Sequence, residues 1–354
     1  MANIKFSAFN TETNSANVDF LVGYQGTTMK KIAPSNLSAY PFLIDGSGSL
    51  YSGFVPSGLS GSPSKNTTLG INAGASLTTG FENVYIGYNA GKITTSANRR
   101  IAVGVEAYAN VSTGGQYGIS IGWYAGRSST SNEAINIGRG AGQLCSGAEA
   151  INIGRDAGRV VVSGPGAATN VGYQSGYSQT SGVENTNFGY KAGFSNTTNG
   201  SRTCIGYQAG QSSTGAWNTL VGAYAGRLIT GAGNTAVGRN ALLNNTSGGS
   251  NVAVGHEAGN WTAAGGTNTF IGTAAGRQNS SGNSNTAVGR EASRSSLGDG
   301  HVAIGYQSGY SQTSGTGNTN IGYQAGYSNT TAADRTIIGY EAGEFSTGAA
   351  NTFL

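Results

Sequence analysis

Asn318–Gly326 reads Asn-Thr-Asn-Ile-Gly-Tyr-Gln-Ala-Gly, and close variants of this stretch recur along most of the chain. In each variant an apolar residue precedes a glycine, and this repeat glycine occurs at positions 70, 87, 104, 122, 138, 154, 172, 189, 206, 222, 238, 255, 272, 289, 305, 322 and 339. Successive repeat glycines are 16, 17 or 18 residues apart. Such a period is typical of a solenoid, in which each repeat forms one coil stacked on the next. Positions are counted below from the repeat glycine, so that Ile321 is at −1.

The aligned repeats predict a short β-strand immediately before each repeat glycine. Position −1 is always apolar, and position −3 is always Thr, Val or Ile. Residues at i and i+2 of a strand share one face, so we expect these two columns to stack into a thin apolar seam that the coil encloses. Position +3 is always Ala or Ser, which indicates a wall too close for a larger side chain. Position +4 is Gly, marking a bend, except at Tyr108, Leu242 and Ser293.

Position −4 is Asn in nine of the seventeen repeats. We expect these amides to form a ladder that bonds to turn backbone or to the next coil. Stacked coils lie ~4.8 Å apart, which predicts a rod on the order of 80 Å long. One coil buries roughly two or three apolar side chains at ~2 kcal/mol each, whereas ordering its backbone costs ~1 kcal/mol or more per residue. We therefore expect lateral association, and a homotrimer suits a fibre.

Composition and charge exclude several classes of protein. The chain has 61 glycines among 354 residues, but no strict Gly-X-Y triplet, which excludes collagen. The net charge of +4 comes without any Lys/Arg cluster longer than two residues, so no nucleic-acid binding is expected. The sequence contains no stretch of ~18 apolar residues and no export signal at Met1, which predicts synthesis in a host cytoplasm without membrane insertion.

The sequence does not predict a metal or cofactor site. Cys145 and Cys204 occupy different positions of the repeat, so we interpret both as buried small apolar residues rather than as a disulfide or as ligands. The two cysteines and the two histidines lie far apart, at different positions of the repeat, and lack the close spacing of zinc ligands. The fifteen Asp and Glu residues form no recurring acidic nonapeptide, which argues against a calcium-binding roll.

The chain divides into three predicted parts within an all-β fold. Residues 1–44 lack the repeat, and apolar alternation in Val18–Tyr24 and in Lys31–Ala33 predicts a small β-hairpin. Residues 45–65 are rich in Gly, Ser and Pro and are expected to form a linker. Residues 66–354 are expected to form a parallel β-solenoid of about 17 coils of ~17 residues each.

Position +1 is the candidate functional column, because it combines aromatic and guanidinium side chains. If these residues face outward, they form a ladder that could contact sugar rings on a cell envelope; the alternative is that the rings stack on one another or fill a subunit interface. The column comprises Tyr88, Trp123, Arg139, Arg155, Tyr173, Tyr190, Tyr207, Arg239, Arg290, Tyr306, Tyr323 and Tyr340.

An enzyme is not expected, and no catalytic residue is predicted. The segment Ile-Gly-Tyr-Gln-Ala-Gly matches the unit of hexapeptide-repeat acyltransferases, which fit three such hexads into each eighteen-residue coil. Here one hexad fits per coil, and repeats of 16 and 17 residues break that register. Those enzymes also need a catalytic histidine in a loop, whereas His256 and His301 both lie within repeats. An acyltransferase is the least favoured alternative.

The repeats resemble those of bacteriophage tail-fibre proteins. The resemblance rests on Gly322–Thr331, Gly-Tyr-Gln-Ala-Gly-Tyr-Ser-Asn-Thr-Thr, and on Gly189–Thr198, Gly-Tyr-Lys-Ala-Gly-Phe-Ser-Asn-Thr-Thr, and it covers residues 66–354. In that family such repeats often precede an intramolecular chaperone of the endosialidase type, which trimerises the fibre and is then cleaved off; this sequence contains no such chaperone. The resemblance implies a non-enzymatic virion fibre that binds a glycan or protein on the host surface.

Two further resemblances concern attachment. Residues 19–37 resemble a module that opens many structural proteins of marine contractile-tailed phages, which implies that residues 1–44 bind other virion proteins. The Val/Ile-Gly repeats are also similar to head domains of trimeric autotransporter adhesins. Those adhesins have shorter repeats, an export signal and a membrane anchor, so a bacterial surface adhesin remains the alternative to a viral fibre.

Overall fold

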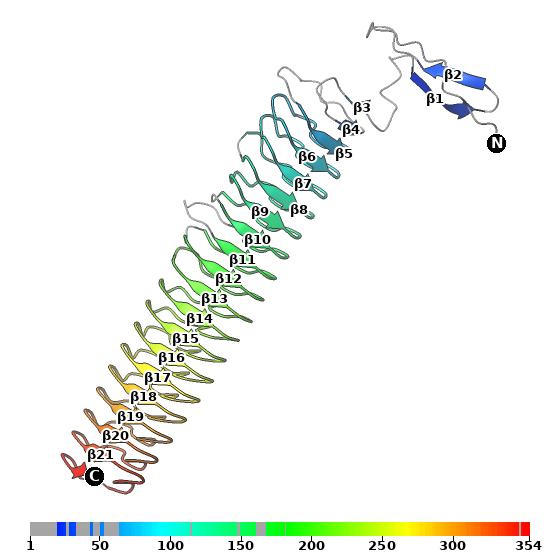
Figure 1. Cartoon of the computed structure of the whole chain (residues 1–354). Coiled ribbons are helices and arrows are strands. Elements are labelled where there is room, and N and C mark those ends of the chain that lie inside the picture. The colour runs from blue at the N-terminus through cyan, green and yellow to red at the C-terminus, as the bar shows by residue number, and fades with distance from the viewer. Residues whose placement is uncertain are drawn as a thin grey trace, which may run out of the picture.

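The molecule is dominated by a rod of stacked coils that carry their short strands along one side (Figure 1). The computed structural model describes residues 20–25, 28–32, 43–44, 50–52, 64–113, 115–146, 149–160, 168–180, 182–346 and 348–354. The seventeen strands that precede the repeat glycines have three residues each and are β5 (Thr67–Leu69), β6 (Val84–Ile86), β7 (Ile101–Val103), β8 (Ile119–Ile121), β9 (Ile135–Ile137), β10 (Ile151–Ile153), β11 (Thr169–Val171), β12 (Thr186–Phe188), β13 (Thr203–Ile205), β14 (Thr219–Val221), β15 (Thr235–Val237), β16 (Val252–Val254), β17 (Thr269–Ile271), β18 (Thr286–Val288), β19 (Val302–Ile304), β20 (Thr319–Ile321) and β21 (Thr336–Ile338).

Consecutive strands pair in parallel, and each residue pairs with the residue at the same repeat position in the next coil. Ile86 pairs with Val103, and Val103 pairs with Ile121. The ladder continues to β22 (Thr352–Phe353), which pairs in parallel with β21. The predicted parallel β-solenoid, with one column of equivalent residues stacked behind another, is therefore confirmed.

The strands before Asn66 add two features. β1 (Phe20–Gln25) and β2 (Thr28–Ile32) pair antiparallel, which confirms the predicted hairpin. β4 (Leu50–Ser52) pairs in parallel with β5 and antiparallel with β3 (Leu43–Ile44). The solenoid ladder thus begins one strand earlier than Asn66, inside the range expected to be a linker.

The orientation of the strands differs from the prediction. In every strand from β5 to β21 the middle residue, at −2, is buried, while the flanking residues at −3 and −1 are half-buried or exposed. Ile135-Asn136-Ile137 is an example, because the asparagine points into the coil and the two isoleucines point away from it. The expected apolar seam at −3 and −1 therefore lies on the outside. Side chains alternate between the two faces of a strand, so a three-residue strand directs either one or two of them inward. The coil is narrow and accommodates only one inward side chain from each strand.

Residues at −2, +3 and +7 fill the interior instead. The Ala or Ser at +3 is buried in nearly every coil, as its invariance predicted. The column at −2 changes character along the rod. Asn136, Asn152, Asn170 and Asn187 form an internal amide ladder, with each Nδ2 donating to the preceding Oδ1 at 2.9 Å. Later coils carry an apolar cluster in the same column.

The side chains at −2 and +4 compete for the same space inside the coil. A Cβ added to Gly91 would lie 2.9 Å from the ring of Tyr85, and one added to Gly210 would lie 2.7 Å from Sγ of Cys204. The three coils without Gly at +4 each have alanine at −2: Tyr108 goes with Ala102, Leu242 with Ala236 and Ser293 with Ala287. An exchange of volume therefore explains Tyr108 and Leu242, and the small Ser293 also fits beside an alanine.

The bends are fixed by the backbone. Repeat glycines have φ between +127° and +137°, and a Cβ on Gly154 would lie 2.5 Å from the carbonyl oxygen of Gly172 in the next coil. No L-residue with a side chain fits both constraints. Positions +2 and +4 are left-handed in all seventeen coils, even where the residue is Glu257 or Tyr224. The corner therefore has the same shape whatever the coil contains.

The asparagines at −4 form the predicted ladder. Oδ1 of Asn251 accepts from the backbone N–H of Asn268 at 2.9 Å, and Oδ1 of Asn268 accepts from that of Asn285 at 2.8 Å. Each amide also donates from Nδ2 to a turn, as Asn268 does to the carbonyl of Gly282 at 2.9 Å. Both expected kinds of partner, turn backbone and the next coil, are therefore present.

Candidate functional site: the outward-facing ladders

The twelve residues proposed at +1 all lie on the outside of the rod. Arg139, Arg155, Arg239 and Arg290 are exposed, and so are the aromatic residues except Tyr173 and Tyr306, which are half-buried. The left-handed residue at +2 turns the chain immediately after this column, so the side chain at +1 projects from the corner. The side chains at +1 therefore face outward, which was the condition for the predicted ladder.

The tyrosines at +1 stack in two ladders of three. In the first, Tyr190 lies between Tyr173 and Tyr207 with ring centroids 5.2 and 5.0 Å apart and interplanar angles of 10° and 7°. In the second, Tyr323 lies between Tyr306 and Tyr340 at 5.1 and 5.0 Å. These distances match the spacing between coils, because the stacked rings occupy the same repeat position in successive coils.

An arginine covers the first ring of each ladder. The guanidinium of Arg155 lies 5.5 Å from the ring centroid of Tyr173, and that of Arg290 lies 5.7 Å from Tyr306. Arg139 lies 4.8 Å from the ring of Trp123 in the same way. Tyr88 and Arg239 belong to other coils, outside these two ladders.

This stacking limits what the column can bind. The faces of the internal rings are occupied by neighbouring rings or by a guanidinium, so the alternative in which the aromatic residues stack on one another describes most of the column. The ring edges with their hydroxyl groups remain accessible, and so does the end face of Tyr340, whereas Tyr207 at the end of the first ladder meets Tyr224 edge-on at 5.3 Å. Tyr340, at the end of the second ladder, is 72% exposed, and a hydrogen bond with Glu341 is the main cause that raises the pKa of its hydroxyl.

A second ladder at +5 was not predicted. Tyr177 stacks on Phe194 at 5.1 Å, and Tyr310 stacks on Tyr327 at 4.9 Å. Arg159 covers Tyr177 and also donates to its hydroxyl at 2.7 Å. The available signal was the aromatic residue four positions after an aromatic residue at +1, as in Gly-Tyr-Gln-Ser-Gly-Tyr.

The two sets of ladders are copies of one arrangement. Residues 172–182 and 305–315 both read Gly-Tyr-Gln-Ser-Gly-Tyr-Ser-Gln-Thr-Ser-Gly. Each copy is preceded by a pair of arginines four residues apart, Arg155 and Arg159 or Arg290 and Arg294, and the second arginine of each pair covers a ring at +5. The interiors differ, because Cys204 in the first copy corresponds to Ile337 in the second. The two copies thus share the same stacked surface side chains although the side chains buried inside their coils differ.

The columns at −3 and −1 form a second outward surface. Phe188 is 54% exposed, and Leu69, Ile121 and Ile271 are about two-fifths exposed. This surface was missed because an apolar column suggests burial, and the pairing of −3 with −1 does not say which face of the strand is inside.

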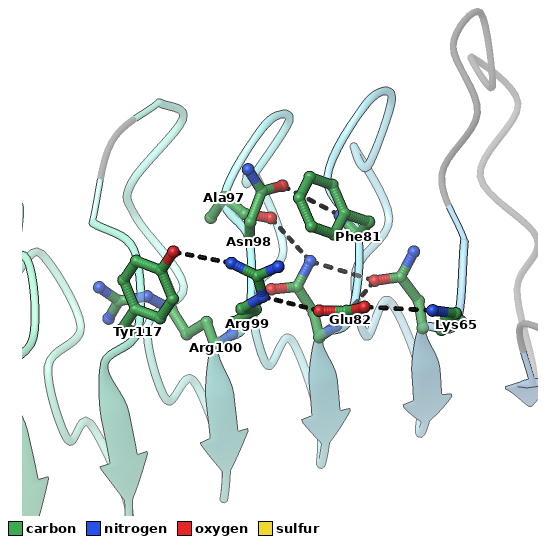
Figure 2. A network of polar contacts seen from close by, with 10 residues as sticks. Lys65, Phe81, Glu82, Ala97, Asn98, Arg99, Arg100 and Tyr117 are labelled. Carbon is green, nitrogen blue, oxygen red and sulfur yellow. Dashed lines mark hydrogen bonds and ion pairs between the residues drawn. The ribbon is translucent and has the colours of Figure 1, made fainter.

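A polar network occupies the outside at −5 near the start of the shaft (Figure 2). Glu82 accepts from Nε of Arg99 at 2.7 Å and from Lys65 at 3.3 Å, and Arg99 also donates to the hydroxyl of Tyr117 at 2.7 Å. The pKa of Glu82 is lowered, first by Arg99 and then by Lys65. These side chains link four coils across the outer surface.

The described residues include two histidines, two cysteines and several acidic side chains. No group of three His, Cys, Asp or Glu side chains among them is arranged to hold a metal ion. His256 is exposed at +1, whereas His301 is buried at −4. Both cysteines are buried, as predicted, and burial raises the pKa of the Cys204 thiol. Within the described ranges, no helix has the length and apolarity needed to span a bilayer.

A shallow surface hollow lies over the turns of three successive coils. It brings the carboxylate of Asp299 close to the hydroxyl groups of Ser281 and Thr313 and the amide of Asn283, with no histidine or cysteine in its lining. The ladders therefore consist of stacked rings, guanidinium groups and aliphatic side chains.

Comparison with known proteins gave no match: no family model, no curated protein and no solved structure matches this chain.

Proposed function

We propose that this chain forms the shaft of a fibre on a virus particle, most simply a bacteriophage, with a structural and adhesive role and no enzymatic one. The observation that carries the proposal is the constancy of the coil. Seventeen coils share one register and one corner geometry, and the side chains that distinguish them lie either inside or in ladders along the surface. A rod of this kind suits a spacer that carries binding groups away from its attachment point.

The resemblance of Gly189–Thr198 and Gly322–Thr331 to tail-fibre repeats supports a viral rather than a bacterial origin. Residues 1–44 would attach the fibre to other virion proteins, and the shaft would contact a glycan or protein of the host surface. Because the ring faces within the ladders are occupied, such contact would use tyrosine hydroxyl groups, guanidinium groups and ring edges.

We further propose that the fibre is a homotrimer. A single coil buries few apolar side chains, and aliphatic columns remain exposed along its outer face. A solenoid with this interior gains stability from lateral association.

The proposal is tested on virus particles. An antibody raised against residues 66–354 should decorate projections on the particle in negative stain, and mass spectrometry of purified particles should detect the chain. The purified protein should scatter X-rays as an elongated particle with a cross-section larger than that of one solenoid. Absence of the chain from particles of a virus that encodes it would refute the proposal.

A further inference from the structure

The outer face of the strand ladder is uncharged over its whole length. The −3 and −1 columns of β5–β21 contain Thr, Val, Ile, Leu and Phe, and neither column has a charged residue in any of the seventeen coils, although 10% of the chain is charged. Val84, Ile86, Ile153 and Val254 are all half-buried or exposed in the single chain. A soluble monomer rarely leaves an apolar patch of more than a few hundred Å² open to water.

We infer that this face, defined as the −3 and −1 side chains of β5–β21 and called the strand face below, is the surface through which copies of this chain bind one another side by side. The inference rests on the proposed fibre and identifies which surface holds it together. Charged residues such as Glu82 and Arg99 at −5, and Arg139 at +1, flank the strand face without entering it. An apolar centre with a charged rim is the usual anatomy of a protein interface.

The dimensions fit an interface between copies. The two columns are ~7 Å apart and extend over seventeen coils of ~4.8 Å, so the strand face covers roughly 800 Å² once side-chain width is included. A stable interface buries about 800 Å² per partner. The strand face of one chain is thus about as large as such an interface requires.

The partner that fits this surface over its full length is a second copy of the rod. Each column has one residue in every coil. A complementary surface must therefore repeat at the same spacing and over the same length. An identical solenoid, parallel and in register about an axis along the rod, meets this requirement in every coil. Because Val and Ile are stiff at χ1, the columns present a fixed row of ridges and grooves to that partner. A globular partner would cover only a few coils.

The first test places charges on the strand face of the full chain. Ile121→Asp, Ile153→Asp and Ile205→Asp are combined in one variant, and a matched control carries three substitutions of apolar side chains exposed elsewhere, Ile71→Asp, Val105→Asp and Trp217→Asp. Sedimentation equilibrium should give an oligomer for the parent and the control and a monomer for the strand-face variant, with self-association weakened ~100-fold or more by the buried unpaired charges. An oligomeric strand-face variant, or a monomeric parent, would overturn the inference.

A second measurement guards against misfolding of the triple variant. Val254→Cys is a mild change on the strand face, and Thr273→Cys places a thiol at +1 as a control. A short bismaleimide should cross-link Val254→Cys chains in solution and leave Thr273→Cys chains single; the reverse pattern would place the interface on the aromatic side. Failure of the fibre proposal is separate, because it would show as absence of the chain from virus particles even if the strand face joins copies.

Discussion

Two stretches of the same rod are filled in opposite ways. The coils of β9–β12 carry an internal ladder of asparagine amides, whereas the coils of β13–β19 carry Leu220, Phe270 and a series of small apolar residues in the same column. Both stretches have the same strand length, the same left-handed bends and an uncharged outer face. The corners and the backbone ladder therefore define the coil, and its interior can be filled either by amides or by apolar side chains.

The largest effect should come from the corners, equally in both stretches. Gly154→Ala in an amide-filled coil and Gly272→Ala in an apolar-filled coil each place a Cβ 2.5 Å from the carbonyl oxygen of the next repeat glycine, at φ near +130°. Each should destabilise its coil by about 4 kcal/mol or more, because strain and overlap add. Urea unfolding followed by circular dichroism measures this.

Gly300→Ala is the control for the corner variants, because nothing lies within 4 Å of the added Cβ and its φ of +70° costs only ~1–2 kcal/mol. A clearly smaller loss in one stretch than in the other would show that the interior, rather than the corner, sets the shape there.

An exchange of fillings should have the next largest effect. Asn170→Leu leaves Oδ1 of Asn152 and Nδ2 of Asn187 without their ladder partners, and should cost about 2–4 kcal/mol. Leu220→Asn buries an amide beside Cys204 and Ala236, and should cost a similar amount. Hydrogen exchange of the neighbouring strands locates the loss. If Asn170→Leu were stabilising, the amide ladder would be a tolerated interior rather than a supporting one.

A pH titration tests one residue of the apolar-filled stretch. His301 occupies the −4 column, where its Nδ1 accepts from the backbone N–H of Asn318 at 3.3 Å and lies 3.0 Å from Nε2 of Gln312. Burial is the main cause that lowers its pKa to about 4. The unfolded chain has a histidine pKa of ~6.5 and binds the proton first, so stability is full above pH 6.5 and falls by up to ~3 kcal/mol as the pH drops towards 4.

His301→Asn restores the side chain most common at −4 and should remove this part of the pH dependence. Thermal unfolding of both proteins at pH 7 and pH 4.5 compares them. An identical drop in both would assign the acid sensitivity to other groups.

The smallest effect should come from the outer polar network. Arg99→Ala removes the bonds to Glu82 and Tyr117, but all three side chains contact water (Figure 2). We expect the smallest loss of stability in this series, and it should disappear at high salt because these charges are screened by solvent and ions. Urea unfolding at low and high ionic strength measures it, and a loss comparable to that of Asn170→Leu would mean that the outside holds the coils together as strongly as the filling does.

The sequence predicted the period, the parallel ladder, the asparagine column and the buried cysteines, because each depends on residues that recur at one position. It did not predict which face of the strand is inside. Apolar residues at −3 and −1 share a face whether that face is inner or outer, and the inner residue varies from Asn136 to Phe270, so its column carries no recurring signal. The stacked rings at +5 were missed because that position is aromatic in only four of the seventeen coils.

Each coil contacts only the coil before it and the coil after it, and this has a genetic consequence. Residues 172–182 and 305–315 are identical and lie eight coils apart, so unequal crossing-over between such stretches adds or removes eight whole coils. At ~4.8 Å per coil, that is a step of ~38 Å. The coils on either side of the new junction would pair in the same strand register as before. The length of the rod can therefore change between generations without any new packing having to evolve.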